Sequence, residues 1–191
     1  MDNAGLLLKK ALKLEYITIV WNVAEGLLCV LVGVITGSVS LFAYGLESSI
    51  EVFASGLVVW DLKGADKTRE KMALKLIGAA YLVVSLYIFI DAAQNLLAGH
   101  HADRSFLGII ILAVTVVGMG VLGISKNKIG QKMKSPTVLA DAKFTLIDAS
   151  LAATVIVGLT LNTLFGWWWA DEAMALFLSG VAFREGVREI F

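Results

Sequence analysis

The chain has 191 residues, of which 58% are hydrophobic and 17% are charged, and its formal net charge is zero. A typical soluble domain is roughly half apolar and about a quarter charged, so this composition favours a membrane protein. Zero net charge gives no indication of nucleic-acid binding. The single cysteine, Cys29, excludes an internal disulfide and a cysteine-based zinc cluster.

Apolar stretches long enough to cross a membrane follow one another along the whole chain, because a bilayer core needs about 20 mostly apolar residues per helix. The predicted spans are 16–38, 39–60, 74–98, 106–124, 137–161 and 168–190. Only short polar segments separate them, so no soluble domain is expected. The sequence therefore predicts an all-α polytopic membrane protein, with one six-helix transmembrane domain over residues 1–191.

The basic residues predict the orientation of this bundle. Lysine and arginine gather before the first span, between the second and third, between the fourth and fifth, and at the end of the sixth. Since cytoplasmic segments carry the excess of lysine and arginine, both termini are expected in the cytoplasm of a multi-pass protein of the cell (inner) membrane. The lysines of SKNKIGQKMKSP, Lys126 among them, are expected in a cytoplasmic loop facing anionic lipid.

Three carboxylates are predicted to meet near the middle of the membrane. Glu47 and Glu51 are four residues apart in AYGLESSIEVFAS, so they share one helix face. At a rise of about 1.5 Å per residue, Glu51 lies roughly 16 Å below the outer surface, and Asp148 lies roughly 18 Å above the inner one. Asp141 shares a face with Asp148, two turns nearer the cytoplasm. A carboxylate at the bilayer centre costs at least about 2.5 kcal/mol, which favours a functional role.

These four carboxylates are the candidate metal ligands. Burial and mutual repulsion favour their protonated forms when the site is empty, and bound metal would displace the protons. This behaviour predicts exchange of protons for metal. The alternative is that the acids only hold helices together through hydrogen bonds. Asp141 is close enough to the interface to be solvated instead.

Other polar residues inside the spans are predicted to have accessory roles. Asn22 and Glu25 lie at a comparable depth on the first span. Lys143 should face away from the site, and because a lone intramembrane lysine is costly, an ion pair between Lys143 and Glu25 is predicted. Asp91, toward the outer end of the third span, is a candidate for an exit vestibule or proton path, or a solvated rim residue together with His100 and His101.

Several stretches resemble the cation diffusion facilitator (cation efflux) family. FAYGLESSIEVFASGLVVW is similar to its second span, with Glu47 and Glu51 at the positions of the metal-binding Asp or His and the following Asp. LADAKFTLIDASLAATVIVGL is similar to its fifth span, where Asp148 matches the Asp of His-x-x-x-Asp and Phe144 stands in place of the His. TGSVSLFA and GWWWADEAMALFLSG resemble the first loop and the entry to the sixth span.

The resemblance implies efflux of a divalent transition metal against protons by alternating access, usually in a homodimer. It implies no catalytic site and no cofactor: the metal is the substrate, and the proton is the counter-ion. Phe144 cannot ligate a metal, so Asp141, water or Asn22 would complete the site. Oxygen ligands favour harder ions, which moves the expectation from Zn²⁺ toward Fe²⁺ or Mn²⁺.

The chain also departs from the family. The sequence ends at FREGVREIF, so the cytoplasmic C-terminal domain of many members is not expected here. The absent histidine and absent domain leave open an alternative, a nontransporting membrane partner or regulator that keeps the transporter fold. A third reading, an intramembrane aspartyl hydrolase, would use two acids on separate helices, but the sequence has no glycine-framed aspartate pair for it.

Overall fold

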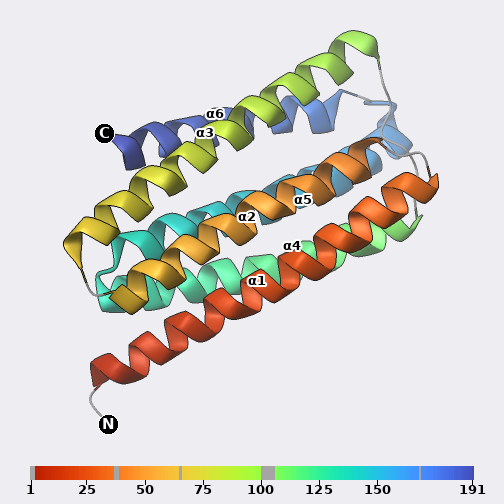
Figure 1. Cartoon of the computed structure of the whole chain (residues 1–191). Helices are drawn as coiled ribbons and strands as arrows, with labels where there is room; N and C mark the ends of the chain where they lie inside the picture. The colour runs from red at the N-terminus through yellow and green to blue at the C-terminus, as the bar shows by residue number, and fades with distance from the viewer. Residues whose placement is uncertain (1–2, 37–38, 65, 100–105, 168) are drawn as a thin grey trace.

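The computed structural model describes residues 3–36, 39–64, 66–99, 106–167 and 169–191. The described residues form six helices (Figure 1): α1 (Asn3–Thr36), α2 (Val39–Gly64), α3 (Lys67–Ala98), α4 (Phe106–Met133), α5 (Pro136–Phe165) and α6 (Ala170–Ile190). The predicted all-α fold is confirmed. Several helices extend beyond the predicted spans, because the helical backbone continues through lysine-bearing turns that an apolar window leaves out.

Helices that follow one another in the chain run in opposite directions, which brings both chain ends to the same end of the bundle (Figure 1). The start of α1, the ends of α2, α4 and α6, and the starts of α3 and α5 lie there, and we name it the lysine-rich end. The most extensive packing joins α1 with α2, α4 with α5, and α3 with α6. The first two pairs form a four-helix group, and the third pair packs against α2 and α5.

Two of these helix pairs approach closely at glycines. A methyl group built onto Gly45 of α2 would lie 2.7 Å from the carbonyl oxygen of Gly26 on α1. In the α3–α6 pair, a methyl group on Gly78 would lie 2.9 Å from the carbonyl oxygen of Gly186. Small residues allow such close backbone contact between membrane helices. The α1–α2 and α3–α6 spacings therefore depend on these positions.

Replacing Gly45 with alanine is expected to destabilise the protein by about 1–3 kcal/mol, because the added methyl group overpacks the α1–α2 contact. Gly56→Ala, in the same helix, is the matched control, since a methyl group there meets nothing within 4 Å. It should be neutral or stabilising, because alanine is the better helix former. Thermal unfolding of both variants in the same detergent measures the difference, and equal unfolding temperatures would contradict the prediction.

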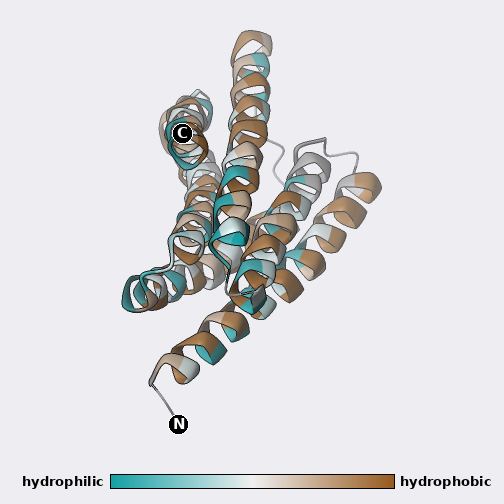
Figure 2. Ribbon diagram, turned by 60° about the vertical axis from the view of Figure 1, so that its left-hand side comes forward, coloured by the Kyte–Doolittle hydropathy of each residue, from teal (hydrophilic) through white to brown (hydrophobic). Residues whose placement is uncertain are grey.

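The outer surface of the bundle is apolar. Large side chains such as Leu27 (61% exposed), Val34 (67%) and Val117 (67%) point outward, and Figure 2 shows hydrophobic residues along much of every helix. Among the described residues, three helical stretches are long and apolar enough to cross a membrane by themselves: Ala4–Val32, Lys67–Ala98 and Ile109–Met133. Since soluble monomers rarely expose large apolar surfaces, the fold is that of an integral membrane protein.

Candidate functional site

Three of the predicted metal ligands line one cavity between α2 and α5. Glu47 and Glu51 come from α2, Asp148 comes from α5, and the cavity has a volume of about 10 Å³. Side chains of α3 and α6 also line it: Tyr81, Val84 and Ala182. A cavity of about 10–15 Å³ holds one water molecule, so the space fits a single small occupant.

Several charges act on the acids of this cavity, and Glu51 interacts with both acidic and basic side chains. Its side chain is buried, and both carboxylate oxygens lack a hydrogen bond. The charges of Asp148 and Asp141 repel that of Glu51, and the charge of Lys126 attracts it. Glu47 is repelled by Glu51 and by Asp91 on α3. Buried carboxylates in such numbers require protons or cations to offset their charge.

The carboxylates share a cavity without forming a finished coordination sphere. Within the ranges that the structure describes, no three His, Cys, Asp or Glu side chains are close enough to hold one metal ion. Coordination of an ion would therefore require the acids of α2 and α5 to move closer together than they are here.

Phe144 occupies the cavity wall where the family resemblance would place a histidine. Its buried ring packs edge-on against Tyr81, with ring centroids 4.5 Å apart. The Tyr81 hydroxyl donates a hydrogen bond to the carbonyl oxygen of Ala140, at 2.9 Å. Phe144 thus joins α5 to α3 by packing, and it contributes no ligand atom.

Asp141 lies away from the cavity and contacts Lys126. Both side chains are fully buried, and the Lys126 ammonium forms an ion pair with the Asp141 carboxylate. The prediction that Lys126 lies in a cytoplasmic loop is wrong, because α4 continues to Met133 and directs Lys126 into the bundle. The alternative that Asp141 is solvated is wrong for the same reason. Its use as a metal ligand would require Lys126 to be displaced.

Glu15 also contacts Lys126, although it is not among the predicted site residues. Its Oε2 atom lies 2.9 Å from Lys126 Nζ, and both side chains are fully buried. Glu15 lies one residue before the predicted span 16–38, whereas α1 begins at Asn3. The sequence contains a signal for it, because Glu15 lies three, seven and ten residues before Thr18, Asn22 and Glu25, which is the spacing of one helix face. In the structure this face is buried, and its residues include Ala11, Glu15, Thr18, Asn22, Glu25 and Cys29.

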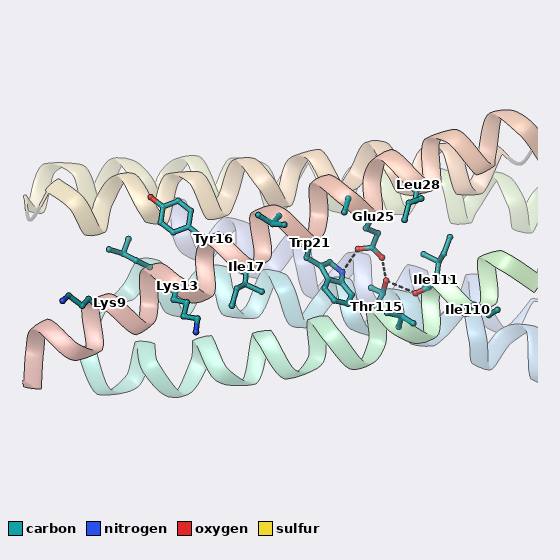
Figure 3. Close-up of a pocket in the computed structure, with 14 residues that line it drawn as sticks. Lys9, Lys13, Tyr16, Ile17, Trp21, Glu25, Leu28, Ile110, Ile111 and Thr115 are labelled. Carbon is teal, nitrogen blue, oxygen red and sulfur yellow. Dashed lines mark hydrogen bonds between the residues drawn. The ribbon is translucent and has the colours of Figure 1, made fainter.

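The predicted ion pair between Lys143 and Glu25 is wrong. Lys143 forms its ion pair with Glu185 of α6, on one side of α5. Glu25 instead accepts hydrogen bonds from Trp21 Nε1, at 3.1 Å, and from the hydroxyl of Thr115 on α4. Figure 3 shows these contacts at the edge of an apolar groove of about 910 Å³ between α1 and α4. Lys143 and Glu25 lie on helix faces that do not meet.

Two other residues predicted to have accessory roles, Asn22 and Asp91, lie apart from the cavity. Asn22 is buried and donates a hydrogen bond to the carbonyl oxygen of Thr18, at 3.0 Å, within α1. Asp91 is half-buried and accepts a hydrogen bond from Asn95, at 3.4 Å. Neither residue lines the cavity of Glu51. His100 and His101 lie outside the described residues.

Ionisable groups inside a membrane bundle are characteristic of proteins that move ions. The fold and the buried carboxylates thus define this class of integral membrane protein. Residues 16–191 match the family model described as the cation efflux transmembrane domain. The chain therefore belongs to the cation efflux, or cation diffusion facilitator, family, which is a family of metal-cation transporters.

Several curated proteins are similar in sequence to this chain. The chain is 28% identical over 161 residues to an uncharacterized transporter of Synechocystis, covering 78% of this chain and 51% of the relative. It is 25% identical over 169 residues to the magnetosome protein MamB of Paramagnetospirillum magneticum, covering 83% and 57%. An uncharacterized transporter of Methanocaldococcus jannaschii is 24% identical over 182 residues, covering 87% and 64%. The chain thus spans about half to under two thirds of the length of these relatives.

Proposed function

We propose that this protein exports a divalent transition metal from the cytoplasm in exchange for protons. The observation that carries the proposal is the cavity shared by Glu47, Glu51 and Asp148, inside a cation efflux domain. These three carboxylates would bind the metal, with water filling the remaining positions. Because the metal must displace protons from buried acids, binding and proton release are coupled at one site.

The arrangement of the helices supports transport by alternating access. Glu47 and Glu51 belong to the α1–α2 pair, and Asp148 belongs to the α4–α5 pair. Movement of one pair against the other would bring the acids together around an ion or separate them. The proposal includes cytoplasmic termini, the inner membrane and a homodimer. Oxygen ligands suit Mn²⁺ and Fe²⁺ better than they suit Zn²⁺.

Metal flux and proton flux measured together test this function. The purified protein is reconstituted into vesicles that contain a metal-sensitive dye and a pH-sensitive dye, and Mn²⁺, Fe²⁺ or Zn²⁺ is added outside. We expect metal to enter and protons to leave, at rates absent from protein-free vesicles. Vesicles inert to every one of these ions would contradict the proposal. They would favour the alternative, a nontransporting membrane partner, for which Phe144 in the ligand position is the supporting observation.

Replacing Phe144 with histidine is expected to shift metal preference toward Zn²⁺ by about tenfold or more, equivalent to roughly 1.4 kcal/mol. Phe144 lines the cavity with Glu51 and Asp148, so an imidazole there would face the carboxylates. Imidazole suits Zn²⁺, whereas Mn²⁺ prefers oxygen ligands. Competition of Zn²⁺ against Mn²⁺ binding measures the shift. Phe144→Leu is the control without a ligand atom, and an equal shift in both variants would contradict the prediction.

A further inference from the structure

The Lys126 ammonium lies in a cage of four side-chain oxygens from three other helices. Glu15 of α1 contributes Oε2, at 2.9 Å from Nζ. Ser55 of α2 contributes its hydroxyl oxygen, at 3.3 Å, and Thr145 of α5 contributes its own, at 3.4 Å. The fourth oxygen belongs to the Asp141 carboxylate, in direct contact with the ammonium. We name these four residues and Lys126 the lysine cage.

The lysine cage has the composition of a cation-binding site, and the cation that it holds is the Lys126 side chain. Two carboxylates and two hydroxyls surround one ammonium, and oxygen is the ligand that hard cations prefer. One carboxylate oxygen of Glu15, Oε1, and one of Asp141, Oδ1, are buried without a hydrogen bond. The two carboxylates thus have more capacity to bind positive charge than Lys126 uses.

The lysine cage lies between the candidate metal site and the lysine-rich end. Ser55 follows Glu51 by one turn of α2, in the direction of that end. Asp141 precedes Asp148 by two turns of α5, a distance of roughly 10 Å along the helix axis, in the same direction. Every residue of the cage is fully buried, so the bundle is closed at this level.

We propose, resting on the proposed function, that the lysine cage is the closed gate between the metal site and the cytoplasm. The tethered ammonium of Lys126 holds α1, α2 and α5 against α4 and offsets the charge of two carboxylates. An ion moving between the cytoplasm and Glu51 must separate these contacts. An entering metal cation competes with Lys126 for Glu15 and Asp141, so its arrival favours opening. Lys126 is a positioning residue, and it does not bind the metal.

Thiol accessibility tests the gate without metal. Cys29, the single cysteine of the chain, is replaced by alanine, and Ile147→Cys places a reporter in the wall of the metal cavity. A membrane-impermeant cationic thiol reagent is applied to inverted membrane vesicles, which expose the cytoplasmic face. In the neutral cage variant Glu15→Gln/Lys126→Met/Asp141→Asn, we expect labelling to be faster by about tenfold or more, as the open population rises. Lys128→Met, an exposed lysine of the same helix, should not change the rate.

The side of the membrane separates a gate from general loosening. An opened gate accelerates labelling in inverted vesicles only, whereas a loosened bundle accelerates it equally in right-side-out vesicles. Unchanged labelling, or equal acceleration from both sides, would overturn the proposal. Should the triple variant not fold, Glu15→Gln alone, which keeps the Lys126–Asp141 pair, is expected to give a smaller acceleration from the cytoplasmic side.

The two proposals fail in different ways, because labelling requires no transport. If the wild type transports metal and the cage variants are labelled at an unchanged rate, the gate is contradicted and the proposed function still stands. Labelling that is faster only in inverted vesicles, in a protein that moves no metal, would contradict the proposed function. It would still support a gate, in a protein that keeps the transporter fold without transporting metal.

Discussion

Replacing Lys126 with methionine is expected to lower the free energy of unfolding by about 3–5 kcal/mol, the usual effect of removing one partner from a buried ion pair. Lys126 is fully buried and contacts two fully buried carboxylates, those of Glu15 and Asp141. Methionine fills a similar volume but leaves both carboxylates without a positive partner. Thermal or denaturant unfolding in detergent measures the loss.

Companion variants identify charge as the cause. Glu15→Gln should cost less than Lys126→Met, because the pair of Lys126 with Asp141 remains. The triple variant Glu15→Gln/Lys126→Met/Asp141→Asn should recover much of the stability, since residues of one network are strongly non-additive. Lys128→Met removes an exposed charge from the same helix and should stay within about 0.5 kcal/mol of the wild type. A triple variant as unstable as Lys126→Met would show that packing, and not charge, determines the loss.

Replacing Glu51 with glutamine, or Asp148 with asparagine, is expected to lower the rate of metal transport by roughly 100-fold or more, equivalent to about 2.7 kcal/mol. Each change keeps the shape of the side chain and removes the negative charge that a bound metal would require. For Glu51→Gln, the free energy of unfolding should stay the same or rise. Its oxygens are buried without hydrogen bonds, so the amide avoids the cost of burying a carboxylate.

Opposite effects on transport and stability characterise a functional acid. We expect Glu51→Gln to unfold at the same or a higher temperature than the wild type while losing metal flux in vesicles. Asp61→Asn is the matched control, because Asp61 is a buried acid of the same helix that accepts a hydrogen bond from Thr137, at 2.7 Å, away from the cavity. Its flux should stay within about twofold of the wild type, a difference of roughly 0.4 kcal/mol. Equal loss of flux in both variants would contradict a specific role for Glu51.

The sequence alone predicted the fold class because lipid imposes a simple rule. A chain that crosses the hydrocarbon must satisfy its backbone within helices, so apolar stretches of about 20 residues identify them. The same regularity predicted that Glu47 and Glu51 share a face and lie level with Asp148, and the structure places all three at one cavity. Helix ends were less predictable, because α1 and α4 continue through turns that carry lysine.

Which charged residues form pairs depends on helix packing, and the sequence does not specify it. The charge of Lys126 predicts a loop position, and the cost of a lone intramembrane lysine, together with the depth of Glu25, predicts a pair of Lys143 with Glu25. In the structure, Lys126 forms ion pairs with Glu15 and Asp141, and Lys143 forms an ion pair with Glu185. Periodicity fixes the side of a helix on which a residue lies, whereas its partners depend on which helices pack together and at what rotation. Helix order and hydropathy therefore determined the bundle and the depth of its acids, and helix packing determined which acids contact a lysine.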